Sequence, residues 1–414
     1  MSTSDSHDVV IIGAGLAGLR AAQVLSGRGL DIVVVEQSSH LGGRVTSFDL
    51  DGFIIDEGFQ LINPSYPELH ATGVIESLDL RRFPRLVTYV GDDSQWTLAD
   101  PRRWPLHALS ALARGDLPPS DAWSLARLFA VARFSSAARL TAIADCSTRQ
   151  GLLDAGVNLS TVDDIVAPFL RGTLLDDALE TSWRYTRLLI KSFASGRPAT
   201  PAKGVRELPR ALRASMPDVV VCLGERVHRV GPTSVSTDRG EIRARAVLVA
   251  TDQDSAAALL DVATTGWRST TTWWFSTPRV VRGDRLRVDV GRRRVASMLD
   301  LASVARERAP HQRSLIAVAV NGHHDEPLDS DIAGDVARYY ALDPRDVELL
   351  IRTAVTRALP TMRPPLNLSP SVRRGEMFVA GDYLQTPSIQ GALVSGRRAA
   401  SAVLEALGVS VERR

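Results

Sequence analysis

The stretch Asp8-Val-Val-Ile-Ile-Gly-Ala-Gly-Leu-Ala-Gly-Leu-Arg20 decides the fold of this chain. Its apolar run predicts a buried strand, its glycines predict a tight turn, and the residues after them predict the start of a helix. A second apolar run, Asp31-Ile-Val-Val-Val35, follows and leads into Glu36. The order of strand, glycine turn, helix and strand predicts a Rossmann-like α/β unit at the start of the chain.

Each glycine of this turn has its own physical task. Gly13 permits the sharp turn out of the strand, Gly15 leaves room for a diphosphate beside the backbone, and Gly18 lets the helix pack closely on the strand. The free N–H groups at the helix start favour phosphate. Glu36 stands 18 residues after Gly18, where a carboxylate can accept hydrogen bonds from a ribose. The pattern predicts a dinucleotide site, and the carboxylate argues against NADP because it would repel a 2′-phosphate.

The composition is that of a globular chain long enough for two domains. Hydrophobic residues make up 44% and charged residues 23% of the 414 residues. The net charge of +2 gives no reason to expect a nucleic-acid partner. Cys146 and Cys222 form neither a disulfide framework nor a zinc-binding spacing, so we expect a reduced, cytoplasmic setting and no metal. No signal peptide and no membrane-spanning run of about 18 apolar residues is expected.

Beyond the first unit, helical and strand-like regions alternate. Residues 76 to 194 show long helical periodicity after a cluster of prolines, with Ser120 as the expected N-cap of a helix through about Leu140. A mixed region from about 256 to 365 follows a group of short strands. The strands expected are Val219–Cys222, Val227–Val230, Val235–Thr237, Ala246–Ala250, Thr270–Phe275, Ser314–Val320 and Glu376–Ala380. A helix from about Ser388 to Leu407 is expected to close the chain.

Three segments together carry a resemblance to a known superfamily. They are the fingerprint at 8–36, the loop Leu41-Gly-Gly-Arg44, and the terminal Val379-Ala-Gly-Asp382 with Ile389-Gln-Gly-Ala392. The combination resembles the FAD-dependent amine oxidases, protoporphyrinogen oxidases and phytoene desaturases. The segments stand at both ends of the chain, so the resemblance covers nearly all of it, but it identifies no substrate.

The resemblance implies an α/β fold with a discontinuous Rossmann-like FAD-binding domain and a second, mixed α+β substrate domain. Combined with the pattern along the chain, it places the FAD-binding domain at 1–75, 195–255 and 370–414. The substrate domain then comprises 76–194 and 256–369. We expect the substrate domain to interrupt the cofactor domain twice.

The resemblance also implies which residues bind FAD. The residues lie in the glycine turn, at the end of the second strand, in the Gly-Gly-Arg loop, in a middle strand and at the terminal helix: Gly13, Gly15, Leu16, Ala17, Gly18, Glu36, Gln37, Gly43, Arg44, Val227, Gly381, Asp382, Gln390, Gly391 and Ala392. Arg44 would contact the diphosphate, Val227 would pair with adenine through its backbone, and Asp382 would lie near the ribityl chain. The helix start at Gln390 would stabilise negative charge on the flavin pyrimidine ring. Neither cysteine lies near residues 381 to 392, so we expect noncovalent FAD.

The implied activity is that of an FAD-dependent oxidoreductase of the desaturase or oxidase type, in which flavin N5 accepts a hydride from a mostly apolar organic substrate. Two departures weaken the amine oxidase interpretation. Lys191 is expected on the surface and Lys203 re-enters the cofactor domain, so neither serves flavin N5, and Ser388 stands where an aromatic residue is expected. A flavin amine oxidase and a redox-neutral flavin-dependent isomerase remain alternatives. No second glycine fingerprint appears, so the electron acceptor is oxygen or another carrier.

Several further residues are left with two interpretations, and no catalytic base is identified. Tyr383 and Gln60 are candidates for lining the isoalloxazine, and Asp56 is either a turn residue or a cofactor neighbour. The region from Trp104 to Leu140 is apolar with interspersed arginines, Arg114, Arg127, Arg133 and Arg139. It is either an ordinary helical part of the substrate domain or a peripheral membrane contact. Trp273 and Trp274 face opposite sides of a strand, and core packing is favoured over a cavity wall for both. The pair His323-His324 is not expected to bind a metal.

Overall fold

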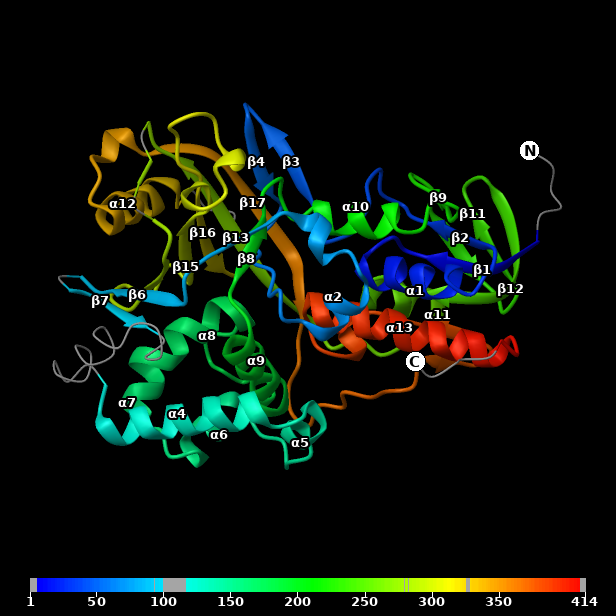
Figure 1. The fold of residues 1–414 in the computed structure, drawn as a ribbon, viewed down its shortest axis with the longest axis horizontal. Helices are drawn as coiled ribbons and strands as arrows, with labels where there is room; N and C mark the ends of the chain where they lie inside the picture. Colours follow the sequence, from blue (N-terminus) through cyan, green and yellow to red (C-terminus); the bar gives the residue numbers. More distant parts are fainter. Residues whose placement is uncertain are drawn as a thin grey trace.

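The computed structural model describes residues 6–92, 94–99, 117–278, 280–281, 283–324 and 328–409. Two units lie side by side, with the N-terminal sheet and its helices at one end and a second sheet with a group of helices at the other (Figure 1). Both sheets draw strands from distant parts of the sequence. The chain therefore crosses between the two units several times.

The first sheet is built around the predicted βαβ unit. β1 (Ser6–Ile12) pairs in parallel with β2 (Ile32–Val35) on one side and with β12 (Gly240–Val249) on the other. The strand order is β10-β11-β12-β1-β2-β9, and β19 pairs with β12 and β18. The remaining strands are β9 (Val220–Cys222), β10 (Val227–Val230), β11 (Ser234–Thr237), β18 (Arg373–Arg374) and β19 (Met377–Val379). Each strand predicted for this sheet is present; the ends shift by at most two residues, except that β12 begins six residues before the predicted Ala246.

Continuous apolar runs form the central strands because both faces of the sheet are covered. Val9 and Ile11 belong to a core with α1 (Leu16–Ser26) and α13 (Ile389–Ala406), whereas Val10 and Ile12 belong to a core on the other face. α1 and α13 pack closely, since a Cβ on Gly396 would lie 2.1 Å from the carbonyl oxygen of Ala17. The terminal helix, which begins 373 residues after the first, thus holds the first helix in place.

The second sheet has the order β17-β13-β16-β15-β14-β6-β7. Its strands are β6 (Leu86–Val90), β7 (Gln95–Ala99), β13 (Trp267–Ser276), β14 (Leu286–Asp289), β15 (Ser297–Asp300), β16 (Ile316–Asn321) and β17 (Glu348–Pro360). The prediction for residues 76 to 194 was incomplete, because β6 and β7 lie in a region expected to be helical. β6 pairs in parallel with β14, about 200 residues later in the chain. A pairing between strands so far apart leaves little sign of either strand in the local sequence.

The helical group lies below the second sheet in Figure 1. Its helices are α4 (Pro119–Phe134), α5 (Ala137–Thr141), α6 (Thr148–Asp154), α7 (Leu159–Thr161), α8 (Ala167–Leu174) and α9 (Trp183–Ser195), with a π turn at Val162–Val166. The predicted N-cap at Ser120 is wrong, because α4 begins one residue earlier at Pro119, a residue suited to the first helical turn. The predicted single helix is two helices, and Ser136 caps the second by accepting a hydrogen bond from the Arg139 N–H.

Shorter elements complete the fold. The helices are α2 (Pro67–Ala71), α10 (Glu207–Ala214), α11 (Gln253–Leu260) and α12 (Asp329–Tyr340). Two small two-stranded sheets comprise the hairpin of β3 (Ser47–Leu50) with β4 (Phe53–Asp56), and the distant pair of β5 (Leu80–Arg82) with β8 (Ala199–Pro201). The 3₁₀ turns are Ile75–Leu78, Leu301–Ser303, Arg306–Arg308, Pro344–Asp346 and Asp382–Leu384.

A fully buried ion pair ties the two units together. The Arg308 guanidinium lies 2.9 Å from the Asp56 carboxylate, and neither side chain is exposed. The same carboxylate accepts hydrogen bonds from the Ser47 hydroxyl and the Val205 N–H. Asp56, for which the sequence left a turn or a cofactor role open, is therefore engaged in structural contacts.

Trp273 and Trp274 are both fully buried, and they pack in two different cores on opposite faces of β13. This confirms the favoured prediction of core packing. We propose the domain boundaries given above for the two units, because the strands of each sheet come from the corresponding segments. In the part of the chain that the structure describes, no helix is long and apolar enough to cross a bilayer.

Candidate active site

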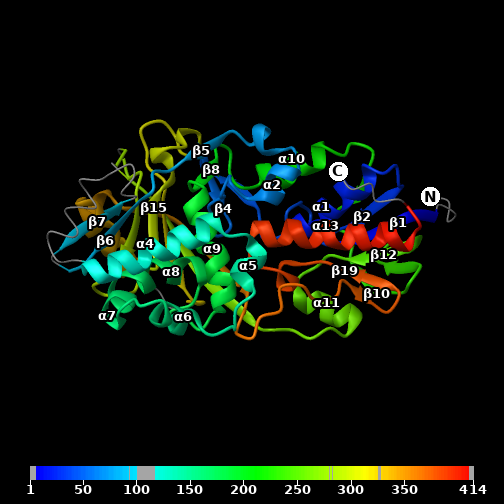
Figure 2. The same ribbon diagram turned by 60° about the horizontal axis from the view of Figure 1, so that its bottom comes forward.

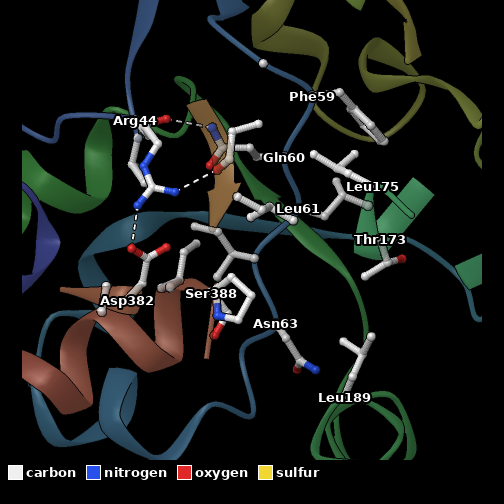
Figure 3. Close-up of a pocket in the computed structure, with 18 of the residues that line it drawn as sticks. Arg44, Phe59, Gln60, Leu61, Asn63, Thr173, Leu175, Leu189, Asp382 and Ser388 are labelled. Carbon is white, nitrogen blue, oxygen red and sulfur yellow. Dashed lines mark hydrogen bonds and ion pairs between the residues drawn. The ribbon is translucent and has the colours of Figure 1, made fainter. Parts of the chain in front are cut away.

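A cavity of about 1690 Å³ is lined by residues of both units. One part of it borders the glycine turn, the Gly-Gly-Arg loop and the start of α13. The other part, which we call the chamber, is lined by residues of segments 76–194 and 256–369. The close-up in Figure 3 shows where the two parts meet, with Arg44 and Asp382 on one side and Thr173, Leu175 and Leu189 on the other.

The glycine turn leaves an open gap beside the backbone. Gly13 has φ +103°, and a Cβ there would lie 2.8 Å from the carbonyl oxygen of Ala250. A Cβ on Gly18 would lie 2.0 Å from the carbonyl oxygen of Gly13, so Gly18 serves close packing. Gly15 differs, since a Cβ on it would meet no atom within 4 Å, and one on Gly43 would meet only the Gly15 Cα, at 3.7 Å. The space between Gly15 and Gly43 therefore suits a diphosphate group.

Glu36 is held rigidly at the end of β2. One carboxylate oxygen accepts a 2.7 Å hydrogen bond from the Ala14 N–H, and the other accepts bonds of 2.8 and 2.9 Å from the N–H and hydroxyl of Ser38. The side chain is 9% exposed and lines the cavity. Gln37 and Val227 line the same end. A carboxylate fixed in this way can receive ribose hydroxyls without reorganising.

Arg44 and Asp382 meet although they are 338 positions apart in the chain. Their side chains form a 2.6 Å ion pair, and the guanidinium also donates to the Ala358 carbonyl oxygen at 2.6 Å (Figure 3). The guanidinium carbon lies 5.5 Å from the Trp267 ring centroid. Gln60 donates a 2.8 Å hydrogen bond to the Arg44 carbonyl oxygen. These contacts fix a cation at the junction of the two parts of the cavity.

The start of α13 lines the cavity, but of the predicted residues Gln390, Gly391 and Ala392 only Ala392 does so. The Ser388 hydroxyl accepts a 3.0 Å hydrogen bond from the Gly391 N–H and so caps the helix. Gln390 turns away, because its side-chain oxygen accepts a 3.0 Å bond from the Glu68 N–H of α2. Gly391 is required for packing, since a Cβ there would lie 1.9 Å from the Thr386 carbonyl oxygen.

Most residues implied by the resemblance line the cavity. They are Gly13, Gly15, Leu16, Ala17, Glu36, Gln37, Gly43, Arg44, Val227, Gly381, Asp382 and Ala392, and Gln60 lines it as well. Gly18, Gln390 and Gly391 do not; the two glycines allow close packing, and Gln390 accepts the hydrogen bond from Glu68. Tyr383 was wrongly considered for the isoalloxazine wall. Its ring packs over Gly381 and into the core on the other face of the first sheet, and it does not line the cavity.

The chamber is strongly apolar. Its lining includes Phe83, Leu86, Val87, Leu125, Phe129, Ile165, Phe169, Leu189, Phe193, Leu286 and Leu299. Among the described residues, no acidic side chain and no lysine of segments 76–194 and 256–369 lines it, and the arginines that do are Arg85, Arg133 and Arg357. The sequence did not reveal this chamber, because its walls come from elements far apart in the chain.

Three tyrosines line the cavity, two in the chamber and Tyr66 in the part beside α13. Tyr66 and Tyr185 lie near the start of α13, where the Tyr185 hydroxyl donates a long, 3.4 Å bond to the Pro387 carbonyl oxygen. Burial raises the pKa of Tyr66 to about 12. Tyr89 of β6 lines the chamber from the second sheet. All three stay protonated near neutral pH.

The lysines do not contribute to this site. Lys191 was expected on the surface, but its ammonium group is half-buried and donates to carbonyl oxygens at the end of α4, the shortest at 2.8 Å to Ser135. It caps that helix, as cations do at helix C-termini. Lys203 is exposed and does not line the cavity.

Comparison with known proteins gives one match across nearly the whole chain. A family model described as flavin containing amine oxidoreductase matches residues 16–404. Putrescine oxidase from Kocuria rosea is 39% identical over 83 residues, which are 20% of this chain and 17% of that protein. Carotenoid 3,4-desaturase from Haloarcula japonica is 40% identical over 58 residues, 14% of this chain and 12% of that protein. These alignments thus span only a small part of the curated relatives.

The whole fold has a counterpart among solved structures. An oxidoreductase from Methanosarcina mazei superposes with a TM-score of 0.75 over 96% of this chain and 100% of that one, at 16% sequence identity. A likeness at this identity concerns the fold. It confirms the predicted α/β architecture of a Rossmann-like domain joined to a second, mixed domain.

Proposed function

We propose that this chain binds FAD noncovalently and oxidises a mostly apolar, uncharged organic molecule. The proposal starts from the family: the chain belongs to the flavin containing amine oxidoreductases. This membership confirms the predicted class of flavin-dependent oxidoreductase. Bound FAD would supply flavin N5 as the hydride acceptor. The observation that carries the proposal is the chamber, which adjoins the glycine gap and is mostly apolar: the described lining residues of 76–194 and 256–369 include no carboxylate, and Glu57 of segment 1–75 lines the same cavity.

The part of the cavity beside the glycine turn, which we call the cleft, fits FAD in several independent ways. The gap between Gly15 and Gly43 would hold the diphosphate, and Glu36 would hold the adenosine ribose. Arg44 would balance the diphosphate charge, and Asp382 would keep Arg44 in place beside the ribityl chain. The first turn of α13 would direct its N–H groups toward the flavin.

Noncovalent binding is supported by the cysteines. Neither Cys146 nor Cys222 lines the cavity, so neither sulfur is positioned to bond a flavin. Burial and nearby carboxylates raise the pKa of both thiols, which makes them poor nucleophiles. Acid or heat should therefore release the flavin intact.

The chamber argues for an uncharged substrate. A protonated amine placed among apolar side chains needs a carboxylate or an aromatic cage to replace its hydration. The described wall residues of 76–194 and 256–369 offer no carboxylate, and Ser388 occupies the position where amine oxidases tend to carry an aromatic residue. The protein would contribute orientation and exclusion of water through residues such as Phe169 and Leu189.

A second candidate is a redox-neutral isomerisation. None of the described residues of segments 76–194 and 256–369 that line the chamber is an acid, a histidine or a lysine. A net oxidation must dispose of a proton as well as a hydride, whereas an isomerisation returns both to the substrate. A flavin amine oxidase remains the third candidate. For the net oxidation we propose oxygen or another carrier as the acceptor.

We also propose a peripheral membrane contact through α4, which lies at the front of the molecule in Figure 2. Trp123 and Phe134 of this helix are 73% and 85% exposed, and Arg127 and Arg133 lie between them. Aromatic and basic side chains together suit an anionic lipid surface. Trp104 and Arg114, which belong to the region for which the sequence left an ordinary helix or a membrane contact open, lie outside the described residues.

Anaerobic mixing of the purified flavoprotein with a panel of ligands tests the main proposal. We expect neutral polyenes or terpenoids to bleach the visible flavin band, and simple primary amines and polyamines to leave it. Subsequent exposure to oxygen separates the candidates, since rapid return of the band indicates an oxidase. Bleaching by small amines alone would promote the amine oxidase to first place.

A further inference from the structure

A tyrosine hydroxyl stands without a partner in the chamber wall. Tyr89 belongs to β6, at the end of the molecule away from the glycine turn (Figure 1). Its side chain is 2% exposed and lines the chamber. The ring stacks on Trp96 of β7, with 4.1 Å between ring centroids and 6° between planes. Its hydroxyl makes no hydrogen bond with any residue that the structure describes.

This hydroxyl is available to a ligand in the chamber. Tyr89 lines the chamber, and its oxygen is not among the fully buried polar atoms that lack a partner. The apolar residues that pack with it include Leu117, Ile165 and Val288, whose side chains accept no hydrogen bond. A phenylalanine would fill the same space but would offer a ligand no hydrogen bond.

Tyr89 differs from the other tyrosines that lack a partner. The hydroxyls of Tyr339, Tyr340 and Tyr383 are fully buried and unpaired, whereas the Tyr89 hydroxyl is not among such groups. None of these three side chains lines the chamber. Each lies beside a charged group; the Arg287 guanidinium, for example, is 4.0 Å from the Tyr340 ring centroid. Tyr89 combines an apolar surrounding with open space in front of it.

The surroundings of Tyr89 also restrict the chemistry of its partner. Burial raises the pKa of the Tyr89 hydroxyl, and no charged side chain contributes to that change. A carboxylate or an ammonium group at this place would lose its hydration without meeting a counter-charge. A hydroxyl or ketone oxygen carries no such penalty and can accept the phenol proton.

We infer that Tyr89 hydrogen-bonds a neutral oxygen, in a hydroxyl or a ketone, at the trailing end of an elongated apolar substrate. The reacting carbon lies at the opposite end, beside the glycine cleft. This inference rests on the proposed function for the position of the reacting end. It assigns Tyr89 as a residue that determines specificity, because the hydroxyl is far from the cofactor cleft and touches only the trailing end.

The test compares three ligands that differ at one end. The FAD-loaded protein is titrated with retinol, with its deoxygenated hydrocarbon axerophthene, and with retinoic acid, and binding is followed by quenching of tryptophan fluorescence. We expect retinol to bind about fivefold more tightly than the hydrocarbon, as one neutral hydrogen bond allows. Retinoic acid should bind more weakly than retinol.

Variants then locate the oxygen. Tyr89→Phe should bring the affinities for retinol and axerophthene within about twofold of each other, while Tyr340→Phe, which removes a buried hydroxyl outside the chamber, should keep the preference. Loss of the preference in Tyr66→Phe instead of Tyr89→Phe would place the oxygen at the cofactor end and overturn the inference. Equal affinities in the unaltered protein, or no binding of either ligand, would overturn it too. A preserved preference without flavin bleaching would sink the proposed function alone.

Discussion

The glycine cleft and the chamber are built in opposite ways. The cleft depends on short segments whose backbone geometry is fixed locally, as at Gly13, Gly15 and Glu36. The chamber depends on side chains that come together from β6, from the helices α4, α8 and α9, and from β14 and β15. Backbone contacts tolerate few residue types, whereas an apolar wall tolerates many. The cleft therefore identifies a family, and the chamber determines what one member of it binds.

The largest expected effect comes from filling the glycine gap. Gly15 has φ −69°, which any residue can adopt, and its Cβ position is empty, so Gly15→Leu should fold. The leucine would occupy the space for the diphosphate, and we expect FAD content to fall from about one per chain to near zero. Gly334→Leu is the matched control, because its Cβ also meets open space on exposed α12. Equal flavin content in both variants would remove the cleft from the cofactor site.

This contrast also explains what the sequence could predict. Gly13, Gly15 and Glu36 were recognised because strand, turn and helix follow one another within 30 residues, and each requires a particular residue type. Arg44 and Asp382 were identified separately, from two motifs. Their ion pair could not be predicted from spacing, because the two residues are 338 positions apart in the chain. Only the fold brings their charged groups to within 2.6 Å of each other.

Side-chain direction was the main source of error. Gln390 and Tyr383 lie in the expected motifs, but one binds the Glu68 N–H and the other packs in a core. A motif fixes the backbone, and the side chain then follows its best local partner. Lys191 was misplaced for the same reason, because the carbonyl oxygens at the end of α4 become its partners only after α4 and α9 pack together.

The chamber could not be predicted from the sequence because its wall depends on how distant strands pair. β6 pairs with β14 and β7, and the Tyr89 ring stacks on Trp96 only when this hairpin forms. Parallel pairing across about 200 residues leaves no periodic signal in a short window. Tyr89 had no feature in its local sequence that distinguished it from a core tyrosine.

The next largest expected effect is a loss of stability when the buried ion pair between the two units is broken. Asp56→Ala would leave the fully buried Arg308 guanidinium without its carboxylate, at a cost of about 3–5 kcal/mol in the free energy of unfolding. Asp49→Ala removes an exposed carboxylate that pairs with Arg206 at the surface and should cost about 1 kcal/mol. Denaturant unfolding of both variants measures the difference. Similar losses for the two would mean that the buried pair does not hold the units together.

A smaller effect concerns an acid in the second sheet. Burial raises the pKa of Asp300 from 3.8 to about 7, although its carboxylate accepts hydrogen bonds from the N–H groups of Ala302 and Leu315. Between those two values the folded state holds a proton that the unfolded chain has lost. The free energy of unfolding must then fall as pH rises through this window and level off above it.

Asp300→Asn provides the measurement, because an amide imitates the protonated acid at every pH. The stability of the unaltered protein relative to this variant should decline by up to about 3 kcal/mol between pH 5 and pH 7, and little beyond pH 8. Denaturant unfolding at four pH values is sufficient. Parallel stability curves for the two proteins would show that Asp300 does not titrate in this range.

The smallest expected effect compares one helix cap from each unit. Ser388 caps α13 and Ser147 caps α6, and each hydroxyl accepts a backbone N–H three residues later. Ser388→Ala and Ser147→Ala should each cost about 1 kcal/mol of stability. They should differ in flavin retention, because Ser388 orients the helix start that lines the cofactor cleft, whereas the α6 cap lies in the helical group. We expect Ser388→Ala to weaken FAD binding several-fold and Ser147→Ala to leave it unchanged, as measured by flavin fluorescence on dilution. If the two variants lose flavin equally, retention follows overall stability, and the first turn of α13 has no direct part in holding the cofactor.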